Sequence, residues 1–243
     1  MKADSQPSSI WAILPVKQIG TAKQRLSNIL SAAERQELFR NMLVDVMAAI
    51  AEARSLAGLL VVTREVEVQF LVSQYGARVL PTDTDDGQSA AVTAAAATLS
   101  REGVSEIITL AGDVPLMTAA EIDTVCDSLS AAPAMTIVPN WDETGTNSIA
   151  CSPPHLVPFK FGESSFHRHL RTARAQGIEP NILPLTGMAL DIDTAADLLE
   201  LMRRKVATVT QRFLISSGIA ERLDQQLISA PRHEEAVDSR VRQ

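Results

Sequence analysis

The sequence is poor in aromatic residues and cysteine, and it has no hydrophobic run long enough to cross a bilayer. Aromatic residues make up 4 % of the chain, and its two cysteines, Cys126 and Cys151, fit no CxxC or zinc-finger spacing. The first residues lack the charged start and apolar core of a signal peptide, and the apolar runs are shorter than the roughly 18 residues that span a bilayer. We therefore expect a cytoplasmic protein with no disulfide framework, no zinc finger and no membrane partner.

The chain also lacks an excess of basic residues, because 22 Lys and Arg stand against 29 Asp and Glu and give a formal net charge of −7. Without a basic stripe to release phosphate counterions, nucleic acid is not an expected partner. With 243 residues, of which 46 % are hydrophobic, one large domain can bury a core without metal or disulfide staples. Any phosphate group must then be bound by a local cluster of cations.

Short apolar blocks alternate with longer stretches of helical period, which is the pattern of β-α units on a mostly parallel sheet. Val, Ile and Leu dominate these blocks, as expected for strands buried on both faces. The predicted strands are 10–16, 59–63, 78–80, 106–111, 134–138, 148–151 and 179–183. The predicted helices are 31–53, 66–75, 89–101, 118–130, 166–176 and 194–204, with Ser31, Thr118 and Thr194 as N-caps.

The character of the sequence changes after Arg204. The next segment is amphipathic and is interrupted by Gly218, and the last residues are polar. We predict a main domain over residues 1–204 and a helical extension with a flexible tail over residues 205–243. Exposed apolar residues on this extension would support a homodimer interface. The residues expected there are Phe213, Leu214 and Ile215.

Three cations, Lys17, Lys23 and Arg25, follow the first predicted strand. Ligands of open α/β sheets bind beyond the carboxyl ends of the strands, and cations at this place suit a triphosphate. A solvated basic loop is the alternative interpretation. The segment contains neither the GxxxxGK[ST] loop nor the GxGxxG fingerprint, which argues against both common nucleotide-binding motifs.

Carboxylates follow two other apolar segments. Asp113 comes directly after the predicted strand 106–111, and Asp191 and Asp193 alternate along an extended segment and so face the same side. Mg²⁺ prefers one or two carboxylates together with phosphate oxygens, so these residues are candidate ligands. Asp is also an ordinary turn residue after a strand. Asp197 is interpreted as a first-turn charge that the helix dipole favours.

Two glycine-containing loops are candidates for binding a small anion. Gly145, Thr146 and Asn147 offer backbone amides and a hydroxyl, and Gly162 lies just before a helix that begins near Ser165. Two ordinary turns are the alternative. His167 and His169 lie on different faces of that helix, so a shared metal is not expected.

Several segments together resemble a known family. They are PVK…AKQRLS at 15–27, ERQELFRNMLVDV at 34–46, LAGDVPLM at 110–117, GTN at 145–147, FGESSFHRH at 161–169 and LDIDTAADL at 190–198. In this order they resemble the guanylyltransferases of coenzyme F420 biosynthesis, which use 2-phospho-L-lactate, phosphoenolpyruvate or 3-phospho-D-glycerate. The resemblance covers residues 10–204.

The resemblance implies a Rossmann-like, three-layer nucleotidyltransferase domain of the glycosyltransferase-A type. It also implies that GTP is joined to a small phosphorylated acid with release of pyrophosphate and with Mg²⁺ as cofactor. By position, Lys17, Lys23 and Arg25 would hold the triphosphate, Asp113 with Asp191 or Asp193 would hold Mg²⁺, and Thr146, Gly162 and Ser165 would bind the acid.

The chain departs from the family at one place. Where many members have Gly-Leu-Asn at the start of the helix that contacts the nucleotide, this chain has Gly87, Gln88 and Ser89, whose polar groups are candidates for guanine binding. Two alternatives therefore stay open. One is a related nucleotidyltransferase with another nucleotide, or with a molybdopterin or sugar phosphate as acceptor, and the other is a non-catalytic nucleotide-binding subunit.

Overall fold

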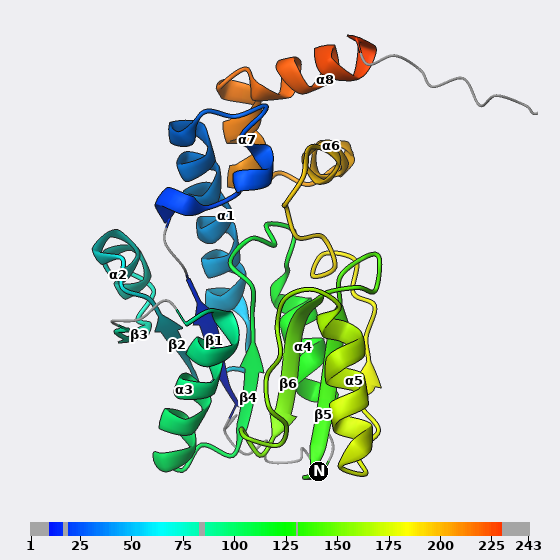
Figure 1. Ribbon diagram of the computed structural model, residues 1–243. Coiled ribbons are helices and arrows are strands. Elements are labelled where there is room, and N and C mark those ends of the chain that lie inside the picture. Colours follow the sequence, from blue (N-terminus) through cyan, green and yellow to red (C-terminus); the bar gives the residue numbers. More distant parts are fainter. Residues whose placement is uncertain (1–9, 17–18, 83–85, 130, 230–243) are drawn as a thin grey trace, which may run out of the picture.

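A seven-stranded sheet with the order β3-β2-β1-β4-β6-β5-β7 forms the centre of the molecule in the computed structural model (Figure 1). The model describes residues 10–16, 19–82, 86–129 and 131–229. The strands are β1 (Ile10–Pro15), β2 (Gly58–Val62), β3 (Arg78–Leu80), β4 (Glu106–Thr109), β5 (Ala134–Pro139), β6 (Thr146–Ser152) and β7 (Asn181–Ile182). All seven predicted strands are confirmed, with ends that differ by up to two residues.

The helices are α1 (Ala32–Glu52), α2 (Val66–Ser73), α3 (Gln88–Arg101), α4 (Ala119–Asp127), α5 (Ser165–Ala175), α6 (Ala195–Arg203), α7 (Val209–Ser216) and α8 (Ile219–Ser229). Two short 3-10 helices, η1 (Ile19–Thr21) and η2 (Gln24–Leu26), precede α1. The three predicted N-caps are confirmed, because Ser31, Thr118 and Thr194 each form a capping box with the acidic residue three positions later.

Helices cover both faces of the sheet, which gives three layers (Figure 1). Neighbouring residues of β1 show the alternation: Leu14 packs with residues of α1, α2 and α4, whereas Ile13 packs with residues of α3 and α5. The predicted three-layer α/β architecture is therefore confirmed. In the part of the chain that the structure describes, no helix is long and apolar enough to cross a membrane.

One antiparallel strand decides which loops meet at the edge where β1 and β4 end. The pairs β1-β2, β1-β4, β2-β3 and β5-β7 are parallel, but β6 runs antiparallel to both β4 and β5. The start of β6, at Thr146, therefore lies at the carboxyl edge of the parallel strands. The register between β5 and β6 shifts by one residue beyond Val138, and such an irregularity changes the direction of the neighbouring side chains.

The predicted helical extension is present as α7 and α8, which lie above the sheet in Figure 1. Both helices pack on the main body rather than standing free. Asp45 of α1 accepts hydrogen bonds from the N–H groups of Val209 and Thr210, at 2.7 and 2.9 Å, at the start of α7. A shared hydrophobic cluster joins Leu26, Leu30, Leu38 and Met42 to Leu198, Leu201, Leu214, Ile219 and Leu223.

The expected exposure of the apolar residues on this extension is wrong for Leu214, which is fully buried against this cluster, and Phe213 is partly buried there. Ile215 is 60 % exposed. The helix turns its apolar face toward α1, so it offers less surface to a second copy than its sequence indicates. The homodimer stays a prediction, and the predicted tail from residue 230 onward lies outside the described residues.

The adjacent residues Leu214 and Ile215 test this packing. We expect Leu214→Ala to lower the free energy of unfolding by about 2–5 kcal/mol, because it leaves a cavity in the shared cluster. The control Ile215→Ala should change it by less than about 0.5 kcal/mol. Urea unfolding of both variants provides the measurement, and equal effects would show that α7 is not held by this cluster.

Candidate active site

Lys23 lies at the centre of a group of charged residues at the carboxyl edge of the sheet. Its Nζ is 2.5 Å from Asp113 Oδ2 and 2.7 Å from Asp193 Oδ1, and its side chain is only 5 % exposed. Lys23 follows β1, Asp113 follows β4, and Asp193 precedes α6. One ammonium group therefore connects three segments that are far apart in the sequence.

The backbone of Lys23 adopts a left-handed conformation, with φ 56° and ψ 42°. This conformation is uncommon for a residue with a side chain, and non-glycine residues in it are often found at functional sites. Burial disfavours the charged ammonium, but the charges of Asp113 and Asp193 outweigh burial and raise the pKa of Lys23. Burial also opposes the ionised form of Asp193, whereas Lys23 and Arg25 together lower its pKa. Lys23 and Asp193 therefore both carry their charges at neutral pH.

Asp191 has a different environment from Asp193. Burial, and next the nearby charge of Asp113, raise the pKa of Asp191 to about 6, although a hydrogen bond from Asn147 opposes this shift. Asn147 Nδ2 is 3.2 Å from Asp191 Oδ1 and 2.9 Å from the carbonyl oxygen of Met188. This amide thereby attaches β6 to the segment that carries the carboxylates.

Asp197 fixes the loop before α6, in agreement with the prediction that Thr194 is the N-cap of this helix. Its Oδ2 accepts hydrogen bonds from the backbone N–H groups of Asp193, at 3.0 Å, and Thr194, at 2.7 Å. Ile192 N–H donates to the carbonyl oxygen of Asp113 at 3.0 Å, so the two acidic segments are also joined through their backbones.

The structure brings the three predicted metal ligands into one region, but their carboxylates do not converge. Lys23 lies between Asp113 and Asp193, and Asp191 contacts Asn147 instead. Among the described residues, no three His, Cys, Asp or Glu side chains are arranged to hold a metal ion. The assignment of these carboxylates to Mg²⁺ thus stays a prediction.

The predicted acid-binding residues lie on β6 and at the start of α5. Thr146 Oγ1 is 3.1 Å from Nδ1 of His169, and Nε2 of His169 is 2.8 Å from the backbone nitrogen of Lys160. Ser165 and His169 share the buried face of α5, and Gly162 lies in the loop between Lys160 and α5. From the sequence, His169 was considered only as a metal ligand, and a metal was not expected there. Its spacing of four residues from Ser165 was the signal that places both on one helix face.

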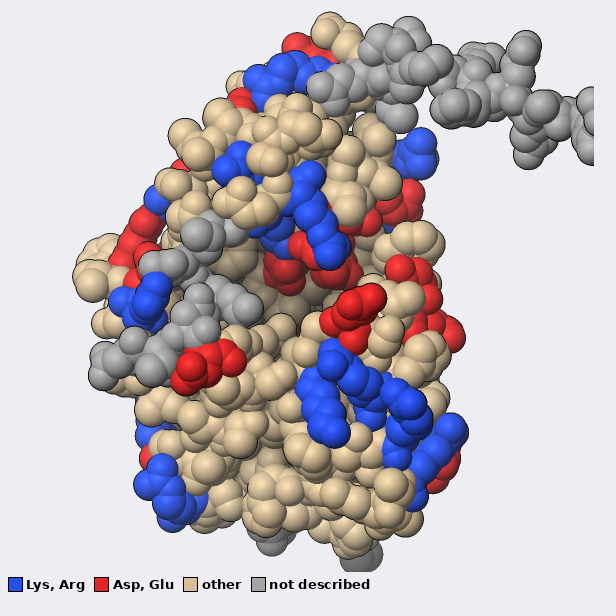
Figure 2. Space-filling view, viewed as in Figure 1, with Lys and Arg blue, Asp and Glu red and all other residues tan. Residues whose placement is uncertain are grey.

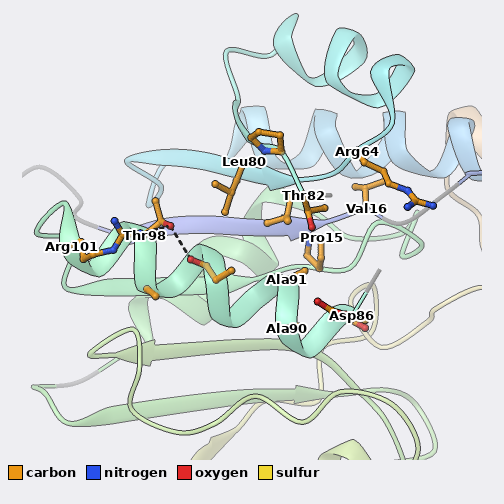
Figure 3. A pocket seen from close by; sticks show the side chains of 16 residues that line it. Pro15, Val16, Arg64, Leu80, Thr82, Asp86, Ala90, Ala91, Thr98 and Arg101 are labelled. Carbon is orange, nitrogen blue, oxygen red and sulfur yellow. Dashed lines mark hydrogen bonds between the residues drawn. The ribbon is translucent and has the colours of Figure 1, made fainter. Parts of the chain in front are cut away.

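A cavity of about 510 Å³ extends along α3 (Figure 3). One part of the cavity is lined by Pro15, the last residue of β1, and by Val16, which follows it. Another part is lined by Gly87 and Gln88 at the start of α3. The cavity also borders the alanine-rich face of that helix, at Ala90, Ala91, Ala94 and Ala97. Small side chains there leave room for a flat ring system.

The remaining predicted residues are placed less centrally. Arg25 NH1 is 3.7 Å from Asp193 Oδ2, but the Arg25 side chain is 76 % exposed, so this ion pair is weak. Ser89 does not line the cavity, and its Oγ accepts a hydrogen bond from the Phe161 N–H at 2.9 Å. Lys17 lies outside the described residues.

Acidic and basic side chains adjoin a hollow in the face shown in Figure 2.

Solved structures share the fold described above, a three-layer α/β arrangement. A nucleotidyl transferase from Methanothermobacter thermautotrophicus has a TM-score of 0.57 and 16 % identity, with 85 % of this chain and 98 % of that chain covered. A protein from Desulfovibrio desulfuricans named as a nucleotide-diphospho-sugar transferase has a TM-score of 0.73 and 16 % identity, with 90 % and 98 % covered.

Sequence comparison gives the family. The family model described as guanylyl transferase, CofC like, matches residues 10–234, so the chain belongs to this family. A phosphoenolpyruvate guanylyltransferase from Roseiflexus castenholzii is 34 % identical over 86 % of this chain and 97 % of its own. One from Conexibacter woesei is 32 % identical, with 82 % and 90 % covered. A 2-phospho-L-lactate guanylyltransferase from Methanothermobacter thermautotrophicus is 30 % identical, with 84 % and 88 % covered.

The resemblance noted in the sequence is therefore confirmed, and the protein is a nucleotidyltransferase of the guanylyl-transferring class. The family match continues past Arg204 to residue 234 and includes both C-terminal helices. It thus reaches further than the resemblance, which covered residues 10–204. The packing of α7 on α1 agrees with this extent.

The raised pKa of Asp191 predicts a pH dependence of stability. Its folded-state pKa of about 6 exceeds the ordinary value of 3.8, so its contribution to stability is present at low pH and is lost as pH rises toward 6. We expect the wild type to lose up to about 3 kcal/mol of unfolding free energy relative to Asp191→Asn across this window. Urea unfolding in metal-free buffer measures it, and a difference independent of pH would contradict the assignment.

Proposed function

We propose that this protein transfers the guanylyl group of GTP to the phosphate of a phosphorylated three-carbon acid, releases pyrophosphate, and serves coenzyme F420 biosynthesis. The observation that carries the proposal is the cluster of Lys23, Asp113 and Asp193 at the same sheet edge as the cavity along α3. Two of the relatives above, at 32 % and 34 % identity, are named for phosphoenolpyruvate. We therefore place phosphoenolpyruvate first among the acids, ahead of 2-phospho-L-lactate and 3-phospho-D-glycerate.

In this reaction a phosphate oxygen of the acid attacks the α-phosphorus of GTP. The new oxygen–phosphorus bond forms as the bond breaks between the α-phosphorus and the oxygen that bridges the α- and β-phosphates. Pyrophosphate leaves with the electron pair of the broken bond. The nucleophile is already an anion, so no general base is needed, and catalysis comes from alignment and charge neutralisation. Lys23, Arg25 and Lys17 are the cations we assign to the triphosphate, and Thr146, Gly162 and Ser165 are the groups we assign to the acid.

The three carboxylates at the site are oxygen ligands of the kind that Mg²⁺ prefers, although they do not converge on one point in this structure. Asp113 and Asp193 face one cation already, the ammonium group of Lys23, and burial disfavours the ionised form of Asp191. We propose that these three side chains hold Mg²⁺ together with GTP, and that Lys23 then exchanges its carboxylate partners for phosphate oxygens. When bound, the ion supplies charge neutralisation at the triphosphate.

We assign the cavity along α3 to the guanosine part of GTP. Gly87, with φ 88°, allows the chain to turn into α3 without a side chain at the cavity wall. The Gln88 amide offers both a donor and an acceptor for the polar edge of guanine. The described cysteines, Cys126 and Cys151, are buried free thiols, which is consistent with the cytoplasmic location we propose.

Pyrophosphate release tests the function directly. The purified full chain is assayed with Mg²⁺ and GTP, ATP or CTP, each paired with one of the three acids. We expect release with GTP and one acid, and none after addition of EDTA. Pyrophosphate release with CTP would contradict the proposed nucleotide. If a folded protein that binds nucleotide releases no pyrophosphate with any of the three acids, the proposed acids are contradicted.

Asp113 provides a second test. We expect Asp113→Asn to lower kcat by about 100-fold or more, because charge stabilisation at the reacting phosphate is lost. The control Asp127→Asn changes an exposed residue of α4 and should keep the wild-type rate. Circular dichroism confirms that both variants fold. An Asp113→Asn enzyme with the full Mg²⁺-dependent rate would refute the metal assignment.

A further inference from the structure

We propose that His169 is a positioning residue that holds the two parts of the phospho-acid site in one arrangement, with Thr146 on one ring nitrogen and the Gly162 loop on the other. This inference rests on the proposed function, because it concerns the acid that Thr146, Gly162 and Ser165 are assigned to bind. His169 is fully buried, and it contacts no group that we assign to GTP or Mg²⁺.

The hydrogen bonds of His169 fix which ring nitrogen carries the proton. The backbone N–H of Lys160 donates to Nε2 at 2.8 Å, so Nε2 must be unprotonated. Nδ1 then carries the hydrogen and donates it to Thr146 Oγ1 at 3.1 Å. Because Thr146 Oγ1 accepts this bond, its own hydrogen is left to donate toward a phosphate or carboxylate oxygen.

His169 is well suited to this role because it is neutral. Burial, followed by the charges of Arg168 and Lys160, lowers its pKa to about 4. The tautomer therefore stays the same across the physiological pH range. Phe161 packs edge-on against the imidazole, with ring centroids 5.1 Å apart, and this contact limits rotation of the ring.

The loop that His169 holds is also fixed from two other sides. Phe161 N–H donates to Ser89 Oγ at 2.9 Å, and Arg168 NH2 donates to the Phe161 carbonyl oxygen at 3.2 Å. Gly162 follows directly with φ 104°, a conformation that favours glycine. His169 is the member of this set that hydrogen-bonds to Thr146 on β6. A backbone hydrogen bond from the Phe166 N–H to the Thr144 carbonyl oxygen, at 3.2 Å, also joins the start of α5 to the segment before β6, so His169 adds the side-chain link that reaches the Thr146 hydroxyl itself.

Three substitutions separate the two hydrogen bonds. His169→Asn places an amide nitrogen near the position of Nδ1 and can keep the bond to Thr146, but it cannot reach Lys160. His169→Gln places an amide oxygen near the position of Nε2 and can keep the bond from Lys160, but it does not reach Thr146. His169→Phe keeps the ring and loses both bonds. His167→Asn, on the exposed side of the same helix, is the matched control.

The measurements are KM for the acid and for GTP, kcat, the thermal midpoint, and acid binding by isothermal titration in the presence of a non-hydrolysable GTP analogue. The Asn and Gln variants each lose one hydrogen bond, so we expect KM for the acid to rise about tenfold in both. The Phe variant loses two, so we expect a rise of about 100-fold. KM for GTP should stay within about twofold, and the control should match the wild type.

A purely structural role would lower the thermal midpoint and raise both KM values together, and that result would overturn the proposal. Asn and Gln variants no better than the Phe variant would also overturn it. If the wild type does not turn over any acid, the proposed function fails, but the titration still decides the role of His169. If His169→Phe then loses affinity for the acid and the control His167→Asn keeps it, the positioning role of His169 is supported. A wild type that binds no acid would refute that role.

Discussion

The ion pair of Lys23 with Asp113 and Asp193 is the constraint on which the site depends. The ammonium group is buried and the two carboxylates are partly exposed, and the cost of removing the Lys23 charge from water offsets much of its attraction to them. The value of the ion pair is positional, since one ammonium group holds the segments that follow β1 and β4 and the loop before α6. The left-handed backbone of Lys23 directs the side chain into this position. Three segments that are far apart in the sequence thereby form one centre.

The direction of β6 brings the residues that we assign to the acid next to this centre. Because β6 is antiparallel to β4, its first residues, Thr146 and Asn147, lie at the edge where the parallel strands end. Asn147 joins β6 to the carboxylate segment through Asp191, and Thr146 joins it to α5 through His169. The nucleotide side and the acid side also meet directly, because Ser89 at the start of α3 binds the backbone of Phe161. The two proposed substrate regions are thus parts of one connected network.

Much of the fold could be predicted from the sequence, because periodicity and capping are local signals. The seven apolar blocks gave the seven strands, and the acidic residues three positions after Ser31, Thr118 and Thr194 marked helix starts. Asp113 was recognisable by its place after a strand. Long-range contacts were not available in this way. The burial of Leu214 depends on α1, and the role of His169 depends on a strand that begins 23 residues before it.

We propose that the carboxylates paired with Lys23 form the metal and triphosphate site. A crystal structure of the full chain with GTP and Mn²⁺, with anomalous scattering to locate the metal, tests it most directly. The account predicts Mn²⁺ bound to Asp113 and to at least one of Asp191 and Asp193, with Lys23 Nζ moved onto phosphate oxygens. Mn²⁺ located away from all three carboxylates, with Lys23 still between Asp113 and Asp193, would contradict it.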